Sequence, residues 1–223
     1  MSPADDAFLT ATDAGVVSLW QLDWPAAQPV ASLRTPSSKT LCAFDASGVV
    51  FAAASRHRIY LYDAKNYMAG PFTTFSFEVD DIVEKIQTSV HNIRAHDADA
   101  YGRAAWTDIK FSPDGDNILV ATASPVFLVI DAFEGHIKRV LATSHSEKEL
   151  RTGCDWSPDS KLVLGGSSDG TIHIWNASSG RSAPKLQGHA GAVGTVLCNP
   201  KYLSLASTCS STALWISTNS REA

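Results

Sequence analysis

The sequence predicts an all-β protein in which short antiparallel sheets follow one another as the blades of a β-propeller. Three observations lead to this prediction. Two strand-like segments are joined by a tight turn at Asp169–Gly170, a strand that ends on a large apolar residue recurs along the chain, and a Ser-Pro-Asp turn is repeated. Asp-Gly between apolar segments is a strong hairpin signal, and recurrence at a fixed period indicates a ring of similar sheets.

The strand after this hairpin, residues 171–176, alternates Ile172 and Ile174 with more polar residues and ends on Trp-Asn. This ending is typical of a WD-type blade, which is one four-stranded sheet of the ring. Comparable strand ends lie at Trp20, Tyr62, Ile130, Trp175 and Trp215. Their intervals are 42, 68, 45 and 40 residues, and three of these match the WD period of about 40–45 residues. The longest interval indicates one repeat with an insertion of roughly 25 residues.

Turn residues fall at constant places within these repeats. Residues 111–115 read Phe-Ser-Pro-Asp-Gly and residues 156–160 read Trp-Ser-Pro-Asp-Ser, which is favourable turn chemistry between a first strand and a second. Each repeat therefore reads as strands a, b, c and d, with a tight turn before strand c. The acidic residues assigned to blade turns or strand ends are Asp13, Asp63, Asp131 and Asp169.

The same phase places both chain ends inside blades. Residues 1–6 resemble a turn between strands a and b, Ala7–Thr12 resembles the strand b that follows, and the last repeat stops after strand c at Ile216. We therefore expect a single WD-repeat propeller fragment over residues 1–223, N-terminally incomplete, with about four to five of an expected seven blades. The insertion is expected at about residues 79–103.

The insertion has two interpretations. The simpler one is a surface loop, on the propeller face where WD proteins usually hold partners. The other is a helix capped by Asp80–Asp81, because apolar residues follow at near-helical spacing. These apolar residues are Ile82, Ile86, Val90 and Ile93.

No metal, cofactor or catalytic site is predicted. Four possible ligands in the insertion have irregular spacing and no cysteine beside them, which disfavours a metal. They are His91, His96, Asp97 and Asp99. Glycine-rich phosphate loops and nucleophile elbows are absent from the sequence, so no cofactor is expected. Inward positions of the strands a are expected to carry no acid cluster, which disfavours an enzyme; they are Cys42, Phe44, Trp106, Phe111, Cys154 and Val196.

Composition points to protein partners. The 223 residues carry 18 Lys and Arg against 23 Asp and Glu, with no basic stripe, which disfavours direct binding to nucleic acid. No apolar run is long enough for a transmembrane helix. The four cysteines form no CxxC pair, and we interpret them as reduced thiols of an intracellular protein.

Gly188-His189-Ala190 is a more specific signal. In WD repeats a Gly-His before strand a places the imidazole under the blade, where it forms hydrogen bonds within the sheet. Its expected partners are Ser207 or Thr208, and Trp215. The usual turn aspartate is absent, and Ser210 or Ser211 is expected in its place. Asp13 with Trp20, and Asp169 with Trp175, resemble the same arrangement without an obvious histidine.

These residues together resemble one WD-repeat family, the propeller subunit of COMPASS-type histone H3 methyltransferase complexes (the WD repeat domain protein 82 family). The resemblance covers nearly the whole chain except the insertion. It is carried by residues 1–20, 42–53, 61–63, 70–72, 128–135, 166–176 and 199–215. The last of these stretches, with Cys209 and no turn aspartate, is unlike a generic WD repeat. The insertion looks longer than is usual in the family.

The resemblance implies a non-catalytic adaptor in the nucleus. Such subunits join the methyltransferase to transcribing RNA polymerase II, whose tail is phosphorylated on serine. The family also joins protein phosphatase 1 and cleavage and polyadenylation complexes at transcription termination, which is the alternative function. A generic WD adaptor of another assembly is a further alternative.

Recognition of a phosphorylated tail would need cations on the partner face. By their phase before strands a, the candidates are Lys39, Arg103 and Arg151. Solvated loop charges are the alternative interpretation of these three residues.

Overall fold

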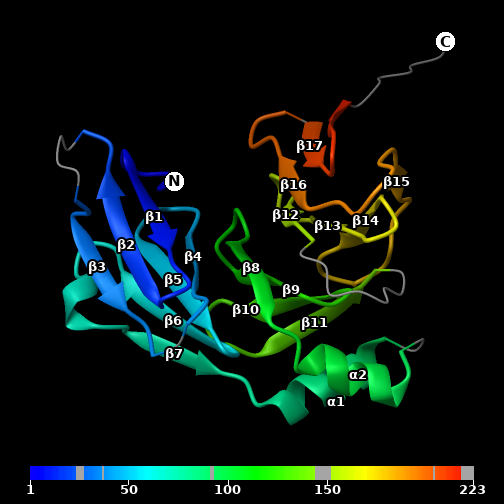
Figure 1. Ribbon diagram of the computed structural model, residues 1–223, viewed down its shortest axis with the longest axis horizontal. Coiled ribbons are helices and arrows are strands. Elements are labelled where there is room, and N and C mark those ends of the chain that lie inside the picture. The colour runs from blue at the N-terminus through cyan, green and yellow to red at the C-terminus, as the bar shows by residue number, and fades with distance from the viewer. Residues whose placement is uncertain (24–27, 37, 91–92, 144–151, 203, 217–223) are drawn as a thin grey trace.

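The computed structural model describes residues 1–23, 28–36, 38–90, 93–143, 152–202 and 204–216. Strands dominate this part of the chain, and each sheet is antiparallel with its strands in chain order. Figure 1 shows the sheets following one another around an arc, with the first and last sheets at opposite ends. The predicted all-β, blade-like architecture is therefore confirmed.

Five sheets are formed by the described residues, and their strands are as follows. The first three sheets are β1 (Ala7–Ala11), β2 (Val16–Gln21) and β3 (Ala31–Arg34); β4 (Leu41–Phe44), β5 (Val50–Ser55), β6 (Arg58–Asp63) and β7 (Thr73–Ser76); and β8 (Trp106–Phe111), β9 (Asn117–Thr122), β10 (Val126–Asp131) and β11 (Ile137–Ala142). The last two are β12 (Cys154–Trp156), β13 (Leu162–Gly166), β14 (Thr171–Asn176) and β15 (Leu186–Gln187); and β16 (Thr195–Cys198), β17 (Ser204–Thr208) and β18 (Thr212–Ile216).

The sheets pack face to face around the arc. Neighbouring sheets touch through their innermost strands, since β4 contacts β8, β8 contacts β12, and β12 contacts β16. Side chains alternate between the two faces of each strand, so a sheet with a neighbour on both sides buries both faces. Strand β10 is the clearest case, because Val126 to Ile130 are all buried. Apolar clusters fill the spaces between successive sheets.

The two Ser-Pro-Asp turns between the first and second strands of a blade have a common hydrogen-bond pattern. Ser112 Oγ donates to the carboxylate of Asp114 and accepts the backbone N–H of Asn117 at 2.9 Å. Ser157 and Asp159 repeat this pattern in the fourth sheet. The Ser-Pro-Asp motifs thus close each a–b turn from within, as the sequence predicted.

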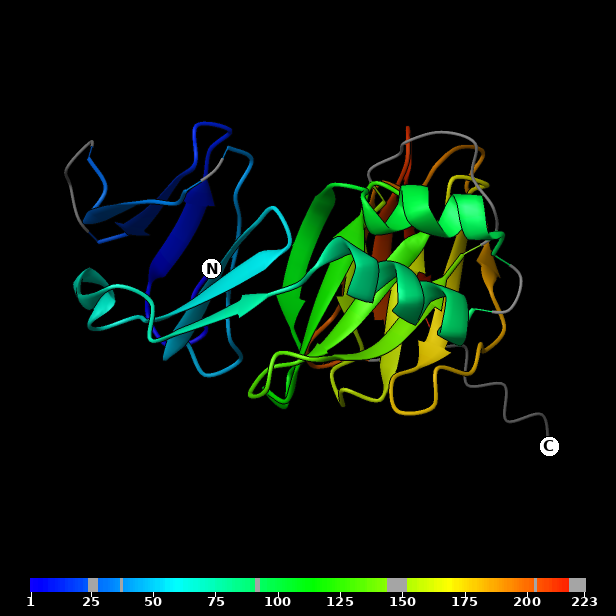
Figure 2. The same ribbon diagram turned by 90° about the horizontal axis from the view of Figure 1, so that it is seen from below.

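The insertion contains a pair of helices, and its interpretation as a surface loop is wrong. Helix α1 (Val79–Ser89) buries Ile82 and Ile86 against the third sheet, and α2 (Ala95–Gly102) packs on α1. Figure 2 shows the two helices side by side across the outside of that sheet. The expected cap is also wrong: Glu78 is the N-cap residue without a side-chain cap bond, and Asp80 and Asp81 lie within the first turn, where their charges favour the helix dipole.

A short 3-10 helix, Tyr67–Ala69, connects β6 to β7. None of the helices among the described residues is long and apolar enough to cross a membrane.

Candidate partner-binding surfaces

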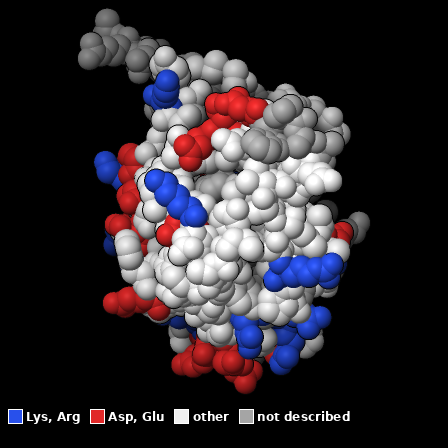
Figure 3. Space-filling view, turned by 90° about the vertical axis from the view of Figure 1, so that its left-hand side faces the viewer, with Lys and Arg blue, Asp and Glu red and all other residues white. Residues whose placement is uncertain are grey.

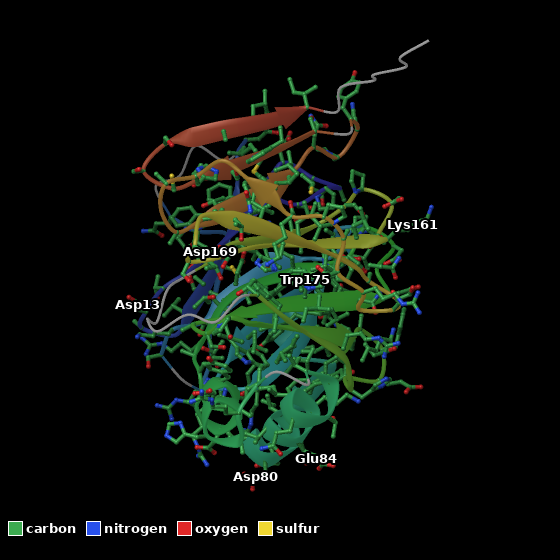
Figure 4. The ribbon with its side chains drawn as sticks, turned by 90° about the vertical axis from the view of Figure 1, so that its right-hand side faces the viewer. Asp13, Asp80, Glu84, Lys161, Asp169 and Trp175 are labelled. Atoms are coloured by element: carbon green, nitrogen blue, oxygen red, sulfur yellow. The ribbon has the colours of Figure 1, made fainter. Side chains whose placement is uncertain are left out.

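The connections between strands define two opposite faces of the arc. Asp13 and Asp169, in b–c turns, lie on one side of the sheets, and Lys161, in an a–b turn, lies on the other (Figure 4). We call these the b–c face and the a–b face. Connections between one blade and the next open on the b–c face, and c–d turns open on the a–b face.

Lys39 lies on the b–c face, beside a cavity of about 410 Å³ between the first three sheets. Asp13 and Trp106 line the same cavity. The Lys39 backbone N–H donates to the carbonyl oxygen of Asp13 at 3.3 Å, and its φ of 58° is left-handed. The side chain is exposed, so the predicted position before a strand a is correct, while binding to a partner stays a prediction.

The other two predicted cations are placed less favourably. Arg103 ends helix α2, where its Nε lies 3.1 Å from Asp99 Oδ1. Hydrogen bonding to that carboxylate raises the pKa of the Arg103 guanidinium. Its charge is therefore already partly satisfied within the insertion. Arg151 lies outside the described residues.

A basic groove on the a–b face was missed by the sequence analysis. It has a volume of about 820 Å³ between the third and fourth sheets. Its cations come from helix α1, strand β11 and the turn before β13, and they are Lys85, Lys138, Arg139 and Lys161, with His136 beside them. Two acids, Asp114 and Asp159, also line it, so cations are in excess. No motif links these residues, because only the folded arrangement brings the three segments together.

The cations of this groove differ in how far they are neutralised. Lys138 Nζ lies 2.8 Å from Asp131 Oδ2, and its hydrogen bond, with those from two backbone amides, lowers the pKa of Asp131 to about 2. Arg139 instead donates to the carbonyl oxygen of Ser178 from Nε and Nη2, at 3.0 and 2.8 Å. Carbonyl acceptors leave its net charge in place, so Arg139 keeps the groove positive.

One face of the molecule shows mixed surface charge (Figure 3). On the face of the molecule shown in Figure 3, Lys and Arg alternate with Asp and Glu around the periphery, and the centre is largely uncharged. The basic groove is thus a local feature.

The inner strands carry charge that the sequence analysis did not expect. Lys110 Nζ lies 3.1 Å from Asp155 Oδ1, and Asp155 Oδ2 accepts the backbone N–H of Cys198 at 2.7 Å. Burial raises the pKa of the neighbouring Asp108, against the opposing effect of Lys110. The expectation of inner strands without an acid cluster is therefore wrong. Asp155 ties three successive sheets together through β8, β12 and β16.

The network predicted for His189 is present. His189 Nε2 lies 2.6 Å from Ser207 Oγ, and Trp215 Nε1 donates to the same oxygen at 2.7 Å. The expected substitute for the turn aspartate is wrong, because it is Cys209. Its Sγ accepts the Ser211 backbone N–H at 3.4 Å and lies 3.1 Å from His189 Nδ1. Cys209 and Asp169 both stand six residues before the tryptophan of their blade.

The other blade residues also hold turns. Asp63 and Asp131 each accept two backbone N–H groups of the following c–d turn, as Asn176 accepts that of Ser179. Trp20 Nε1 donates to Thr10 Oγ1 at 2.8 Å, which is the same strand b hydroxyl that Ser207 provides in the fifth sheet. In the fourth sheet, His173 lies on strand c itself and is stacked on Trp175, so it does not occupy the position of His189.

Possible metal ligands in the insertion are not assembled. His96 lies 3.8 Å from Asp97, and Asp99 faces Arg103; His91 lies outside the described residues. Among the residues that the structure describes, no group of three or more His, Cys, Asp or Glu could hold a metal ion.

Comparison with known proteins agrees with this geometry. A family model described as WD domain, G-beta repeat matches residues 129–176. WD repeat-containing protein 82 of Drosophila melanogaster is 34% identical over 98% of this chain and 62% of that protein. COMPASS component SWD2 of Saccharomyces cerevisiae is 30% identical over 91% of this chain and 58% of its own length. Set1 complex component swd2 of Schizosaccharomyces pombe is 30% identical over 74% of this chain and 42% of its own length.

The successive antiparallel sheets, the blade turns and this match define a WD-repeat β-propeller protein. Within that class, the chain is similar to WD repeat-containing protein 82 over nearly its whole length, and to the SWD2 components over most of it. It spans about three fifths of the length of the first relatives that it matches.

Proposed function

We propose that this chain is part of a non-catalytic adaptor subunit of a COMPASS-type histone H3 lysine methyltransferase complex in the nucleus. The observation that carries the proposal is its similarity, over most of its length, to relatives named as COMPASS and Set1 complex components. The architecture supports this proposal, since blades in series present several separate surfaces to protein partners. No active-site constellation competes with it among the described residues.

The adaptor would link the methyltransferase to the phosphorylated tail of RNA polymerase II. The basic groove on the a–b face supports this finer proposal, because Arg139 and Lys85 offer positive charge beside the hydroxyl and amide groups of Ser178 and Asn176. A phosphoserine needs such charge-assisted hydrogen bonds. The competing site that the sequence predicts consists of Lys39 and Arg103, on the b–c face, together with Arg151, which lies outside the described residues.

Two experiments test the proposal at its two levels. The first is a pull-down of the endogenous protein, with partners identified by mass spectrometry. Recovery of a methyltransferase with its complex supports the adaptor function. Recovery of a phosphatase 1 or polyadenylation module without any methyltransferase would favour the termination alternative over the proposed function. If neither kind of complex is recovered, both functions are excluded.

The second experiment measures fluorescence anisotropy of a polymerase tail peptide, phosphorylated on serine or unmodified. We expect Arg139→Glu and Lys85→Glu each to weaken binding of the phosphorylated peptide by about tenfold, because charge reversal repels phosphate. Lys65→Glu, an exposed change outside the groove lining, is the matched control. If only Lys39→Glu or Arg103→Glu weakens binding, the site lies on the b–c face instead.

A further inference from the structure

A second groove on the a–b face has a different chemistry. It has a volume of about 520 Å³ and lies between the second and third sheets. Phe72, from the β6–β7 connection, is 58% exposed at one wall, and Phe133, from the β10–β11 turn, is 74% exposed at the other. Apolar residues that line the rest of the groove include Val50, Leu61, Phe75, Phe111 and Ala132.

Both phenylalanines stand on ordered backbone. The Asp131 carboxylate accepts the N–H groups of Phe133 and Glu134, each at 2.8 Å, which fixes the turn that presents Phe133. The Phe72 N–H donates to the carbonyl oxygen of Leu61 at 2.9 Å, which continues the pairing of β6 with β7. An exposed aromatic ring on a fixed backbone loses little chain entropy when a partner covers it. These two rings are therefore prearranged for contact.

The charge of the groove is negative. Asp45 and Asp114 line it, and the described residues of its lining include no Lys, Arg or His. Asp45 is held in place by the backbone N–H of Val50 at 2.9 Å. Asp116 is exposed and adjoins the lining without being part of it, since its carbonyl oxygen accepts the N–H of the lining residue Ala132 at 3.1 Å. This rim favours a cationic ligand and disfavours a phosphorylated one.

We propose that this groove binds a short extended peptide of a partner protein, which places one aromatic or aliphatic side chain between Phe72 and Phe133 and a lysine or arginine beside Asp116. The volume suits one large side chain with its neighbouring backbone, and the apolar walls with an acidic rim match both parts of such a ligand. Asp114 lines both grooves, so the a–b face holds an anion-selective and a cation-selective groove side by side. The inference does not depend on which complex the protein joins.

The test uses the full chain and a phage-displayed library of random 12-residue peptides. Selected peptides are synthesised with a fluorophore, and their affinities are measured by anisotropy. We expect the selected sequences to combine an aromatic or aliphatic residue with lysine or arginine. Phe72→Ala and Phe133→Ala should each weaken their binding by about tenfold or more. Asp116→Lys should weaken it several-fold, and more strongly at low salt.

Matched controls distinguish a loss of peptide binding from a loss of folding. Tyr202→Ala removes an aromatic side chain that is 71% exposed on the fifth blade, and it should leave the affinity unchanged. Circular dichroism confirms that each variant is folded. The proposal is overturned if the peptides lack basic residues, or if both Phe variants bind like the wild type. It is also overturned if sedimentation shows that this patch joins two copies of the chain.

Discussion

The fourth and fifth sheets each pair a histidine with the tryptophan of strand c, but by different means. In the fourth, His173 lies on the same strand as Trp175 and stacks on it, with ring centroids 5.5 Å apart and planes 25° apart. In the fifth, His189 comes from the connection before strand a and meets Trp215 edge-on at 61°. The first pair is buried, and the second is joined by a hydroxyl.

One position on strand b accounts for the difference. Register places Val163 opposite Trp175 and Leu205 opposite Trp215. Two residues further along lies Gly165 in the fourth sheet and Ser207 in the fifth. A Cβ at Gly165 would lie 2.8 Å from the Phe127 ring and 2.9 Å from the Trp175 ring, so this position admits no hydroxyl.

Whether a blade has the hydroxyl or the close packing depends on how completely its tryptophan is enclosed by neighbouring sheets. Trp175 contacts Phe127 of the third sheet, and both belong to the core between those sheets. Trp215 lies at the margin of the core between the fourth and fifth sheets, where it is only partly buried. The strand c tryptophan is thus packed against a neighbouring aromatic ring in the fourth blade, and it is hydrogen-bonded to a strand b hydroxyl in the fifth.

The largest expected effect comes from truncating the two tryptophans. Trp175→Ala should lower the free energy of unfolding by about 3–5 kcal/mol, because it opens a cavity in a closed core. Trp215→Ala should cost about 1–3 kcal/mol, because part of that ring is already in water. Urea unfolding followed by circular dichroism measures both. Equal losses of stability would show that the two tryptophan rings contribute equally, which would contradict the difference in packing between the two blades.

Stability should depend on pH through His173 of the fourth sheet. Burial, with a smaller effect of Lys185, lowers the pKa of His173 to about 4 from an ordinary value of 6.5. The unfolded chain binds a proton below pH 6.5 and the folded chain does not until about pH 4. Stability should therefore be fully present above pH 6.5 and fall as the pH decreases, by about 2 kcal/mol at pH 5.

Urea unfolding of the wild type and His173→Phe at pH 7 and pH 5 measures this term. The phenylalanine keeps a ring beside Trp175 and cannot titrate. We expect the difference between the two pH values to shrink by about 2 kcal/mol in the variant. An unchanged difference would mean that His173 is not held neutral.

Removing the strand b hydroxyl should destabilise the fifth blade more than the first blade. Ser207→Ala leaves both Trp215 Nε1 and His189 Nε2 without their partner, and should cost about 1–3 kcal/mol. Thr10→Ala is the matched variant in the first sheet, where a single donor, Trp20 Nε1, is affected. Its cost should be smaller. If thermal unfolding gives Thr10→Ala the larger loss, the histidine adds nothing to the fifth blade.

The blades could be predicted from the sequence, because the patterns that specify them lie close together along the chain. Strand period, Asp-Gly and Ser-Pro-Asp turns lie within single repeats, and the Gly-His signal led to Ser207 and Trp215. His173 was missed because a histidine inside an alternating strand has no signal of its own. The serines offered for the turn aspartate were wrong, because the equivalent position, counted from Trp215, is Cys209.

The surfaces were less predictable, because they are assembled by packing. The basic groove takes residues from helix α1, β11 and a turn near Lys161, and the apolar groove takes Phe72 and Phe133 from different blades. One helix in the insertion was only an alternative, since its burial of Ile82 and Ile86 requires the third sheet as a partner, and the second helix was not predicted. Single-sequence periodicity cannot show which partner is available.

The smallest expected effect concerns the ionisation of one thiol. Cys209 occupies the position of the turn aspartate, and its pKa decides whether it also carries a negative charge. Hydrogen bonds from the Ser211 hydroxyl and backbone N–H, with smaller contributions that include His189, lower the pKa of Cys209 to about 6. Burial raises the pKa of Cys42 to about 11 and that of Cys198 to about 12, and it holds the pKa of Cys154 well above its ordinary value. At pH 7 Cys209 should therefore be the thiol that is mostly thiolate, and the thiolate is the reactive form.

Iodoacetamide labelling read by mass spectrometry follows each cysteine separately. We expect Cys209 to react first at pH 7, with a rate that falls as the pH decreases through about 6. Ser211→Ala removes the largest stabilising hydrogen bond, so its rate profile should move to higher pH. A profile for Cys209 centred near 9, the ordinary value for a thiol, would show a neutral group. The fifth blade would then differ from the fourth in its turn charge as well as in its packing, since the Asp169 carboxylate accepts the Thr171 N–H at the same place.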